Sequence, residues 1–131
     1  MNNFHYPFNL GEQYEKWEFD LELLGYERIL GFDSYFYIKE VYFLGMHPKY
    51  VELLFCLDIL KVVILTIDFN ALEEVQRFRN ILDQNFEKES HYENLDIYKT
   101  LEIELWLIHT PLSNGIDIAY GKKEYLMSIF Y

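Results

Sequence analysis

The sequence predicts an α+β fold, in which a mainly antiparallel sheet of about six or seven strands carries one long helix on one face. Strand-like runs fill residues 16–68 and return over 98–130, while one amphipathic helical pattern lies between them at about 70–88. This grouping of strands, helix and strands favours an antiparallel sheet over alternating βαβ units. The 131 residues include six glycines and three prolines that fall between the periodic segments, so we expect a single domain over 1–131.

The stretch KWEFDLELL at residues 16–24 predicts the first strand. Apolar residues (Trp17, Phe19, Leu21 and Leu23) alternate with acids (Glu18, Asp20 and Glu22), which would give one apolar face and one negative face. A helical spacing of three and four also runs through Leu10, Tyr14, Trp17, Leu21 and Leu24. The strand is the preferred interpretation, with a helical turn at 10–15 before it, and a helix is the alternative.

Composition predicts the next three strands. Residues 35–44 are rich in aromatic and β-branched side chains, and residues 45–48 form the turn after them. Residues 50–57 and 61–68 are apolar on both faces, which predicts two central strands joined at 58–60. A transmembrane helix over 50–69 is disfavoured, because Glu52, Asp58 and Lys61 would each cost about 2.5–3.5 kcal/mol near a bilayer centre.

Residues 70–88, NALEEVQRFRNILDQNFEK, predict the helix. Asn70 suits the N-cap position, and Glu73 lies three residues later, as in a capping box. One face carries Leu72, Val75, Phe78, Leu82 and Phe86 at spacings of three and four. We expect that face to pack on the sheet.

The C-terminal third predicts three more strands after a polar connector. In residues 98–109, YKTLEIELWLIH, one face carries Leu101, Ile103, Leu105 and Leu107, and the other carries Glu102, Glu104 and Trp106. PLSNG at 111–115 predicts a turn. Short strands are expected at about 116–120 and 124–130, on either side of Gly121.

The charge balance limits the classes of partner. There are 22 acidic and 11 basic residues, a net charge of -11, which disfavours nucleic acid and anionic membranes and favours a basic protein. The single cysteine, Cys56, has no partner for a disulfide and fits a buried thiol. The first residues lack the basic and apolar regions of a signal peptide, so the expected location is cytoplasmic.

No catalytic, cofactor or metal motif is present, and we expect neither enzyme activity nor a cofactor. Three arrangements are weighed as alternatives. Glu89, His91 and Glu93 could hold a metal, Glu102 and Glu104 could act as a carboxylate pair, and Cys56 with His109 could form a nucleophile and base. A solvated connector and the solvent face of a strand explain the first two arrangements more simply.

Acids and aromatic residues gather in the second half of the chain, in EKESHYENLDIY and the strand after it. The predicted contact residues are Asp83, Glu87, Glu89, Tyr92, Glu93, Asp96, Glu102, Glu104 and Trp106. Acids steer and pair with a basic protein, while aromatic rings supply desolvated contact area. A second acidic group lies at residues 12–22.

In these stretches, KWEFDLELL and EKESHYENLDIY, the chain resembles immunity proteins of bacterial contact-dependent inhibition and related toxin systems. The resemblance is one of general character over the whole chain: small, acidic, aromatic-rich and without motifs. It implies a cytoplasmic inhibitor that binds a basic toxin domain, such as a nuclease, and blocks its active site or substrate path. The alternatives are a self-associating structural module that uses an uncovered sheet face, and a small enzyme. The inhibitor is expected to be a monomer or a homodimer.

Overall fold

The computed structural model describes residues 6–100, 102–109 and 115–131. These residues form 3-10 helices at Tyr14–Lys16 and Glu18–Asp20, strands β1 (Leu21–Leu23), β2 (Asp33–Tyr37), β3 (Tyr50–Cys56), β4 (Ile59–Asp68), β5 (Glu87–Tyr92), β6 (Leu95–Lys99), β7 (Glu104–His109) and β8 (Gly115–Gly121), and helices α1 (Leu72–Asn85) and α2 (Lys123–Phe130). The α+β class is therefore confirmed. The sheet has eight strands instead of six or seven, and a second, short helix is present.

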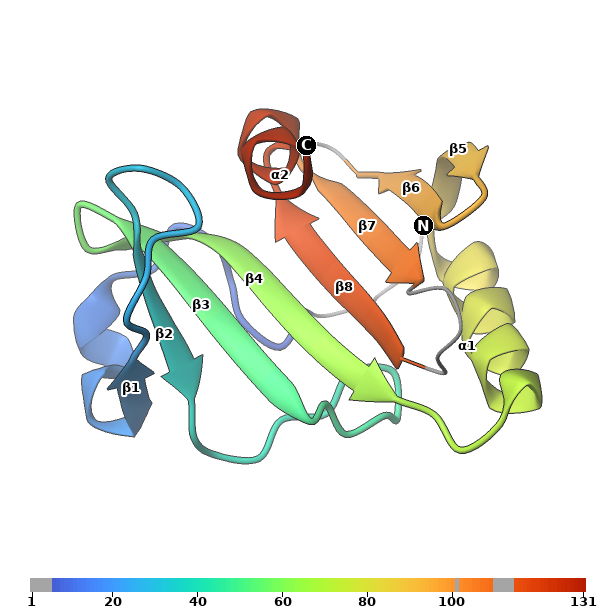
Figure 1. Cartoon of the computed structure of the whole chain (residues 1–131), viewed down its shortest axis with the longest axis horizontal. Helices are drawn as coiled ribbons and strands as arrows, with labels where there is room; N and C mark the ends of the chain where they lie inside the picture. Colours follow the sequence, from blue (N-terminus) through green and yellow to red (C-terminus); the bar gives the residue numbers. More distant parts are fainter. Residues whose placement is uncertain (1–5, 101, 110–114) are drawn as a thin grey trace.

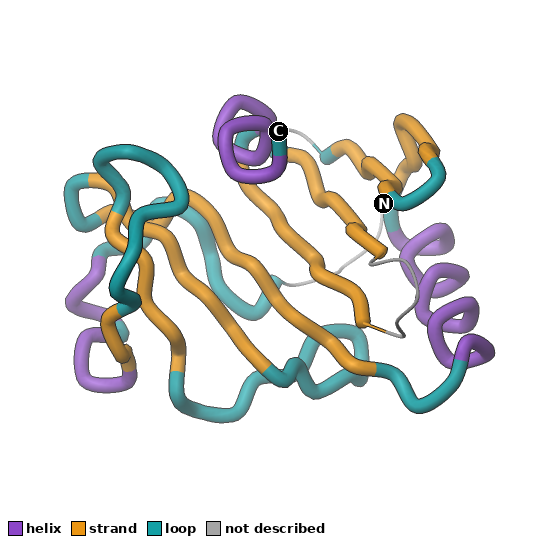
Figure 2. Tube along the Cα trace, viewed as in Figure 1, coloured by secondary structure: helices purple, strands orange, loops and turns teal. Residues whose placement is uncertain are grey.

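All eight strands join one antiparallel sheet in the order β1-β2-β3-β4-β8-β7-β6-β5 (Figures 1 and 2). Strands β1 to β4 follow one another as neighbours, and β5 to β8 do the same in reverse order. The β4–β8 ladder joins the two sets. Strands β4 and β8 therefore lie at the centre, and β1 and β5 form the two edges.

Strands β3 and β4 confirm the expectation of two central strands that are apolar on both faces. Leu53 and Leu54 are adjacent in β3 and point to opposite faces, yet neither has any exposed surface. The hairpin turn lies at Leu57 and Asp58, one residue earlier than expected, and both have positive φ, 51° and 63°. Left-handed conformations at both positions match the twist of a two-residue hairpin.

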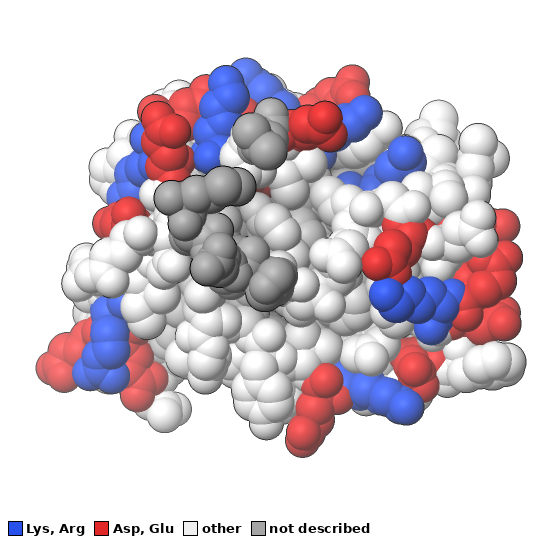
Figure 3. Space-filling view, turned by 180° about the vertical axis from the view of Figure 1, so that it is seen from behind, with Lys and Arg blue, Asp and Glu red and all other residues white. Residues whose placement is uncertain are grey.

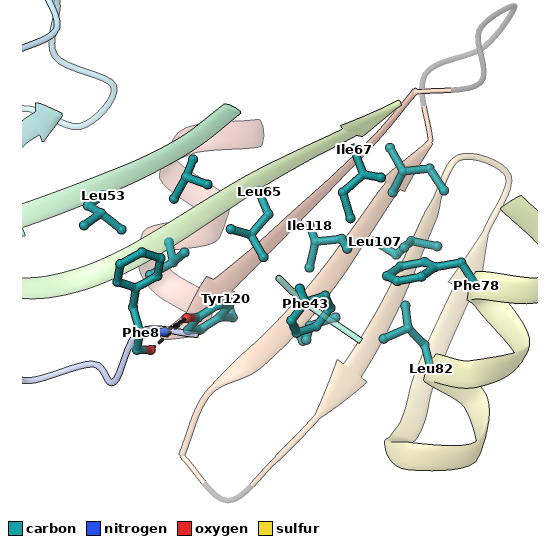
Figure 4. Packing of buried hydrophobic residues seen from close by; sticks show 14 of the residues in the cluster. Phe8, Phe43, Leu53, Leu65, Ile67, Phe78, Leu82, Leu107, Ile118 and Tyr120 are labelled. Carbon is teal, nitrogen blue, oxygen red and sulfur yellow. Dashed lines mark hydrogen bonds between the residues drawn. The ribbon is translucent and has the colours of Figure 1, made fainter. Parts of the chain in front are cut away.

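Both faces of the sheet are covered over part of their area, whereas the sequence predicts cover on one face. On the first face, Phe78 and Leu82 of α1 lie beside Leu107 and Ile118 of the sheet (Figure 4). The segment before β1 covers the other end of that face, where the Tyr120 hydroxyl accepts from Phe8 N–H at 3.1 Å and donates to Phe8 C=O at 2.7 Å. On the second face, α2 and the loop before β2 pack over a separate apolar cluster.

Residues 16–24 form strand only at Leu21–Leu23, so the prediction of a full strand is wrong. Lys16 and Glu18–Asp20 belong to the two 3-10 helices, and the helical turn expected at 10–15 is met only in part. Side chains advance by about 120° per residue in a 3-10 helix, so alternate residues no longer share a face. Trp17 is buried, whereas Phe19, inside the second 3-10 helix, is 90% exposed. Leu23 lies in edge strand β1 and is 67% exposed.

The strand expected at 35–44 is also shorter, because β2 ends at Tyr37. The turn lies at 43–46, two residues before the expected 45–48: Phe43 and Met46 bridge to each other, with Leu44 and Gly45 at positive φ between them.

Helix α1 confirms the long helix in a shorter form. It begins after Ala71 and not after Asn70, and Glu74, in place of Glu73, accepts a hydrogen bond from the Asn70 backbone N–H at 3.1 Å. The helix ends at Asn85, so Phe86 and Glu87 lie outside it. The predicted buried face holds at Val75, Phe78 and Leu82, but Leu72 is exposed.

The C-terminal region contains the largest differences from the sequence-based expectation. The polar connector is a hairpin, β5–β6, that turns at Glu93 and Asn94. Strand β8 confirms the strand at 116–120, but residues 124–130 form helix α2 and not a strand. Leu101 and residues 111–114 of the predicted turn lie outside the described residues, and Gly115 begins β8. Within the described ranges, no helix is long and apolar enough to cross a membrane.

Candidate functional site

Four of the nine predicted contact residues lie together on and just after strand β5. Glu87, Glu89, Tyr92 and Glu93 are all exposed, and we call them the acidic edge. Among the described strands, β5 pairs only with β6, so its outer side is an open edge of the sheet. None of the three carboxylates makes an ion pair with any residue that the structure describes. An open edge with unpaired acids and an exposed ring suits contact with a basic protein.

Behind this edge, Asp83 of α1 is exposed but already engaged. The Tyr98 hydroxyl donates to Asp83 Oδ1 at 2.6 Å, and Lys88 Nζ lies 3.1 Å from the same oxygen. Partial desolvation raises the pKa of Asp83, but the hydrogen bonds from Tyr98 and Lys88 outweigh it, so its pKa is lowered. Burial and the neighbouring carboxylate raise the pKa of Tyr98. Asp83 therefore fastens α1 to the β5–β6 hairpin.

Asp96 of β6 has no exposed surface, so it cannot meet a partner directly. Its Oδ2 accepts from Arg79 Nε and Nη2 at 3.2 and 3.0 Å, and Lys88 Nζ lies 3.8 Å away. Its Oδ1 is bonded to Nδ1 of His91, whose side chain is 61% exposed. The buried Asp96 carboxylate thus contacts three basic side chains. Arg79 and Lys88 are thus engaged by Asp96 and Asp83, and neither forms an ion pair with the edge acids among the described residues.

Glu104 and Trp106 lie in β7 on the face that α2 covers, and both are buried, at 7% and 1% exposure. The expected solvent face of this strand is therefore wrong. Trp106 Nε1 donates to Glu104 Oε1 at 2.9 Å.

Beside this pair is an open hollow of about 390 Å³, which we call the α2 groove. Its lining comes from β5, β6, β7, α2 and Tyr131, and includes Glu104, Trp106 and Tyr92.

Glu102 is exposed and lies apart from this groove, in a second hollow beside Leu10, Lys61 and Lys122. Glu102 and Glu104 therefore open onto different hollows, which weakens their interpretation as a carboxylate pair.

The other two catalytic alternatives also fail to assemble. His91 turns to Asp96, and no cluster of three or more metal-binding side chains occurs within the described ranges. Cys56 is in β3 and His109 in β7, with β4 and β8 between them in the sheet.

The second acidic group lies near the opposite edge of the sheet, at β1. Part of its charge is neutralised locally, because Glu12 pairs with Lys16 and Asp20 Oδ1 lies 3.3 Å from Lys39 Nζ. The hydrogen bond from Lys16 lowers the pKa of Glu12. Seen from behind, charged residues of both signs lie around the margin of the molecule and the visible middle is uncharged (Figure 3). That face carries no field of a single sign.

Sequence reasoning missed the contribution of α2 to the groove, through Lys123 and Met127. The signal was present in the spacing of three and four among Tyr125, Leu126, Ile129 and Phe130, which pack on the sheet from one side of a helix. The prediction of a strand at 124–130 places these four residues on different faces, so it does not indicate their common apolar side.

Comparison with known proteins adds no family. No family model, curated protein or solved structure matches the chain. The acidic edge and the α2 groove are therefore interpreted from their own chemistry.

Proposed function

We propose that the protein binds a basic partner protein through the acidic edge and neutralises it, as an immunity protein neutralises a cognate toxin domain such as a nuclease. The observation that carries this proposal is a set of three exposed carboxylates on an open sheet edge, beside an exposed tyrosine. None of the three has an ion pair with a described residue. Carboxylates speed the encounter with a basic surface, and the ring supplies contact area once the partner has docked.

The surroundings of the edge support this proposal. Arg79 and Lys88, the basic residues closest in the network, are held by Asp96 and Asp83. Lys99 lies opposite Glu87 in the β5–β6 ladder but forms no ion pair with it among the described residues. The exposed edge carboxylates are therefore left to pair with the cations of a partner.

The self-associating module has weaker support, because α2 covers part of the sheet face on which it depended. The enzyme alternative has weaker support too, since its three candidate residue sets are not brought together.

The first test is a pull-down with the whole protein from lysate of its source cell, washed at low and at high salt. The retained protein is then purified, and its association rate and any activity of its own are measured with and without the inhibitor. We expect one basic protein to survive both washes, and its activity to fall to near zero at equimolar inhibitor.

Charge-reversed variants give the matched control. The triple variant Glu87→Lys, Glu89→Lys and Glu93→Lys should slow association by about tenfold or more. Electrostatic steering raises association rates by about 10–10³-fold, and this variant reverses the charge that provides it. Glu15→Lys, Glu18→Lys and Glu22→Lys, at the other end of the sheet, should change the rate much less. Equal loss in both variants, or no basic protein retained, would refute the proposal.

A further inference from the structure

We propose that the α2 groove receives an arginine side chain of the basic partner, with the guanidinium group held by Glu104 and the aromatic walls. This inference rests on the proposed function, because the partner delivers the arginine while docking on the acidic edge. Edge and groove are continuous: Glu89 and Tyr92 of β5 belong to both. A partner lying along β5 therefore has a hollow within reach of its side chains.

The charge of Glu104 is the first reason for a cationic occupant. Glu104 is only 7% exposed, and a carboxylate so nearly buried is costly unless a cation or several hydrogen bonds compensate it. In the described ranges its side chain has one hydrogen bond, from the neutral indole of Trp106, and no ion pair. Lys99 faces it across the β6–β7 ladder without pairing to it. Glu104 lines the groove, so a cation that enters the groove can meet it.

The walls favour a guanidinium group over a compact ammonium group. Tyr92 and Tyr131 line the groove and are 56% and 77% exposed, and a planar guanidinium stacks on aromatic faces while it bonds a carboxylate. Glu104 Oε1 already accepts from Trp106, which leaves Oε2 for the incoming donor. The hollow of about 390 Å³ is large enough for one long side chain and part of its backbone.

Lys123 at the start of α2 is the one positive charge in the lining, and it opposes a cationic occupant. It forms no ion pair with Glu104 among the described residues. It therefore provides a variant whose expected effect has the opposite sign to that of a change at Glu104, and a purely structural role for Glu104 would not produce this pair of effects.

The test uses the whole nitrogen-15-labelled protein and N-acetyl-arginine amide as the probe. The chain has two tryptophans, so two indole N–H signals report separately on the groove and on the opposite sheet face. We expect a saturable shift of the Trp106 signal and none of the Trp17 signal. N-acetyl-citrulline amide, which has the same shape without the charge, should leave both unchanged, and N-acetyl-lysine amide should bind more weakly than the arginine probe.

Two variants sharpen the outcome. Glu104→Gln keeps an oxygen to accept from Trp106 but loses the charge, and should weaken arginine-amide binding by about tenfold or more. Lys123→Gln should strengthen it by about two- to fivefold. Equal binding of the citrulline probe, or wild-type affinity in Glu104→Gln, would overturn the inference.

The two proposals fail in different ways. If the basic partner is retained equally by wild type and Glu104→Gln, and the arginine probe leaves Trp106 unshifted, the groove inference is wrong and the proposed function stands. If the probe binds as expected but no basic protein is retained, the proposed function is wrong and the groove is a guanidinium site for another ligand.

Discussion

Replacing Asp96 by asparagine should destabilise the fold more than any single change on the acidic edge. The Asp96 carboxylate has no exposed surface and contacts Arg79, Lys88 and His91, so it joins α1 to both strands of the β5–β6 hairpin. Asparagine keeps the shape of the side chain but not its charge. Arg79 and Lys88 would then lie close together without the buried anion that holds them.

The magnitude follows from burial and exposure. Removing one member of a buried ion pair costs about 3–5 kcal/mol. The side chains of Arg79, Lys88 and His91 are 20%, 31% and 61% exposed, so water recovers part of that loss. We therefore expect a loss of about 2–3 kcal/mol in the free energy of unfolding. With a urea m-value of about 1.5 kcal/mol/M, the midpoint should fall by about 1.3–2 M.

The assay is urea unfolding followed by circular dichroism, with Glu93→Gln as the matched control. Glu93 is exposed and makes no ion pair in the described residues, so its replacement should stay within about 0.5 kcal/mol of wild type. Adding Arg79→Met to Asp96→Asn should cost less than the sum of the two single changes, since the two residues share one interaction. Equal midpoints for Asp96→Asn and Glu93→Gln would refute the reasoning.

Three further changes test the packing of the sheet. Tyr120→Phe removes the hydroxyl that satisfies both backbone groups of Phe8, and should cost about 2–4 kcal/mol in urea unfolding; an unchanged midpoint would contradict this. Leu57→Asn with Asp58→Gly fits the left-handed hairpin turn better and should raise stability by about 1 kcal/mol, measured as a higher melting temperature, whereas a lower one would contradict it. Gly121→Ala places a Cβ 2.9 Å from a backbone carbonyl of β4 and should cost about 1–3 kcal/mol in the same melts, and wild-type stability would show that the strands can separate to make room.

The sequence predicts the centre of the fold well because most residues of β3 and β4 are buried on both faces. The β-branched and apolar residues of β3 and β4 favour strand locally, and the structure buries them in strands, so local preference and burial agree. Helix α1 is predicted for a related reason: Val75, Phe78 and Leu82 place one apolar stripe on the sheet. Its boundaries are less certain from sequence, since capping depends on which acid reaches the first free N–H group.

The segments at the two ends of the sheet are predicted poorly, because their residue patterns are compatible with more than one secondary structure. Alternation at residues 16–24 fits a strand, yet 3-10 turns bury Trp17 and leave Phe19 in solvent. Strand β5 is missed because an edge strand needs few apolar residues, and its charged side chains resemble a loop. The buried position of Asp96 and Glu104 cannot be read from alternation, since it depends on α1 and α2, which come from distant parts of the chain.

The strand order also shapes the path by which the chain reaches its fold. Six of the seven pairings join strands that follow each other along the chain, and only β4–β8 joins distant ones. Hairpins close quickly, whereas the β4–β8 ladder joins strands that α1 and β5 to β7 separate along the chain, so its formation costs more chain entropy. The two halves of the molecule can thus assemble as separate meanders that meet late. A chain cut between β4 and α1 would retain every local hairpin and lose only the tether, so the two fragments should complement each other when mixed.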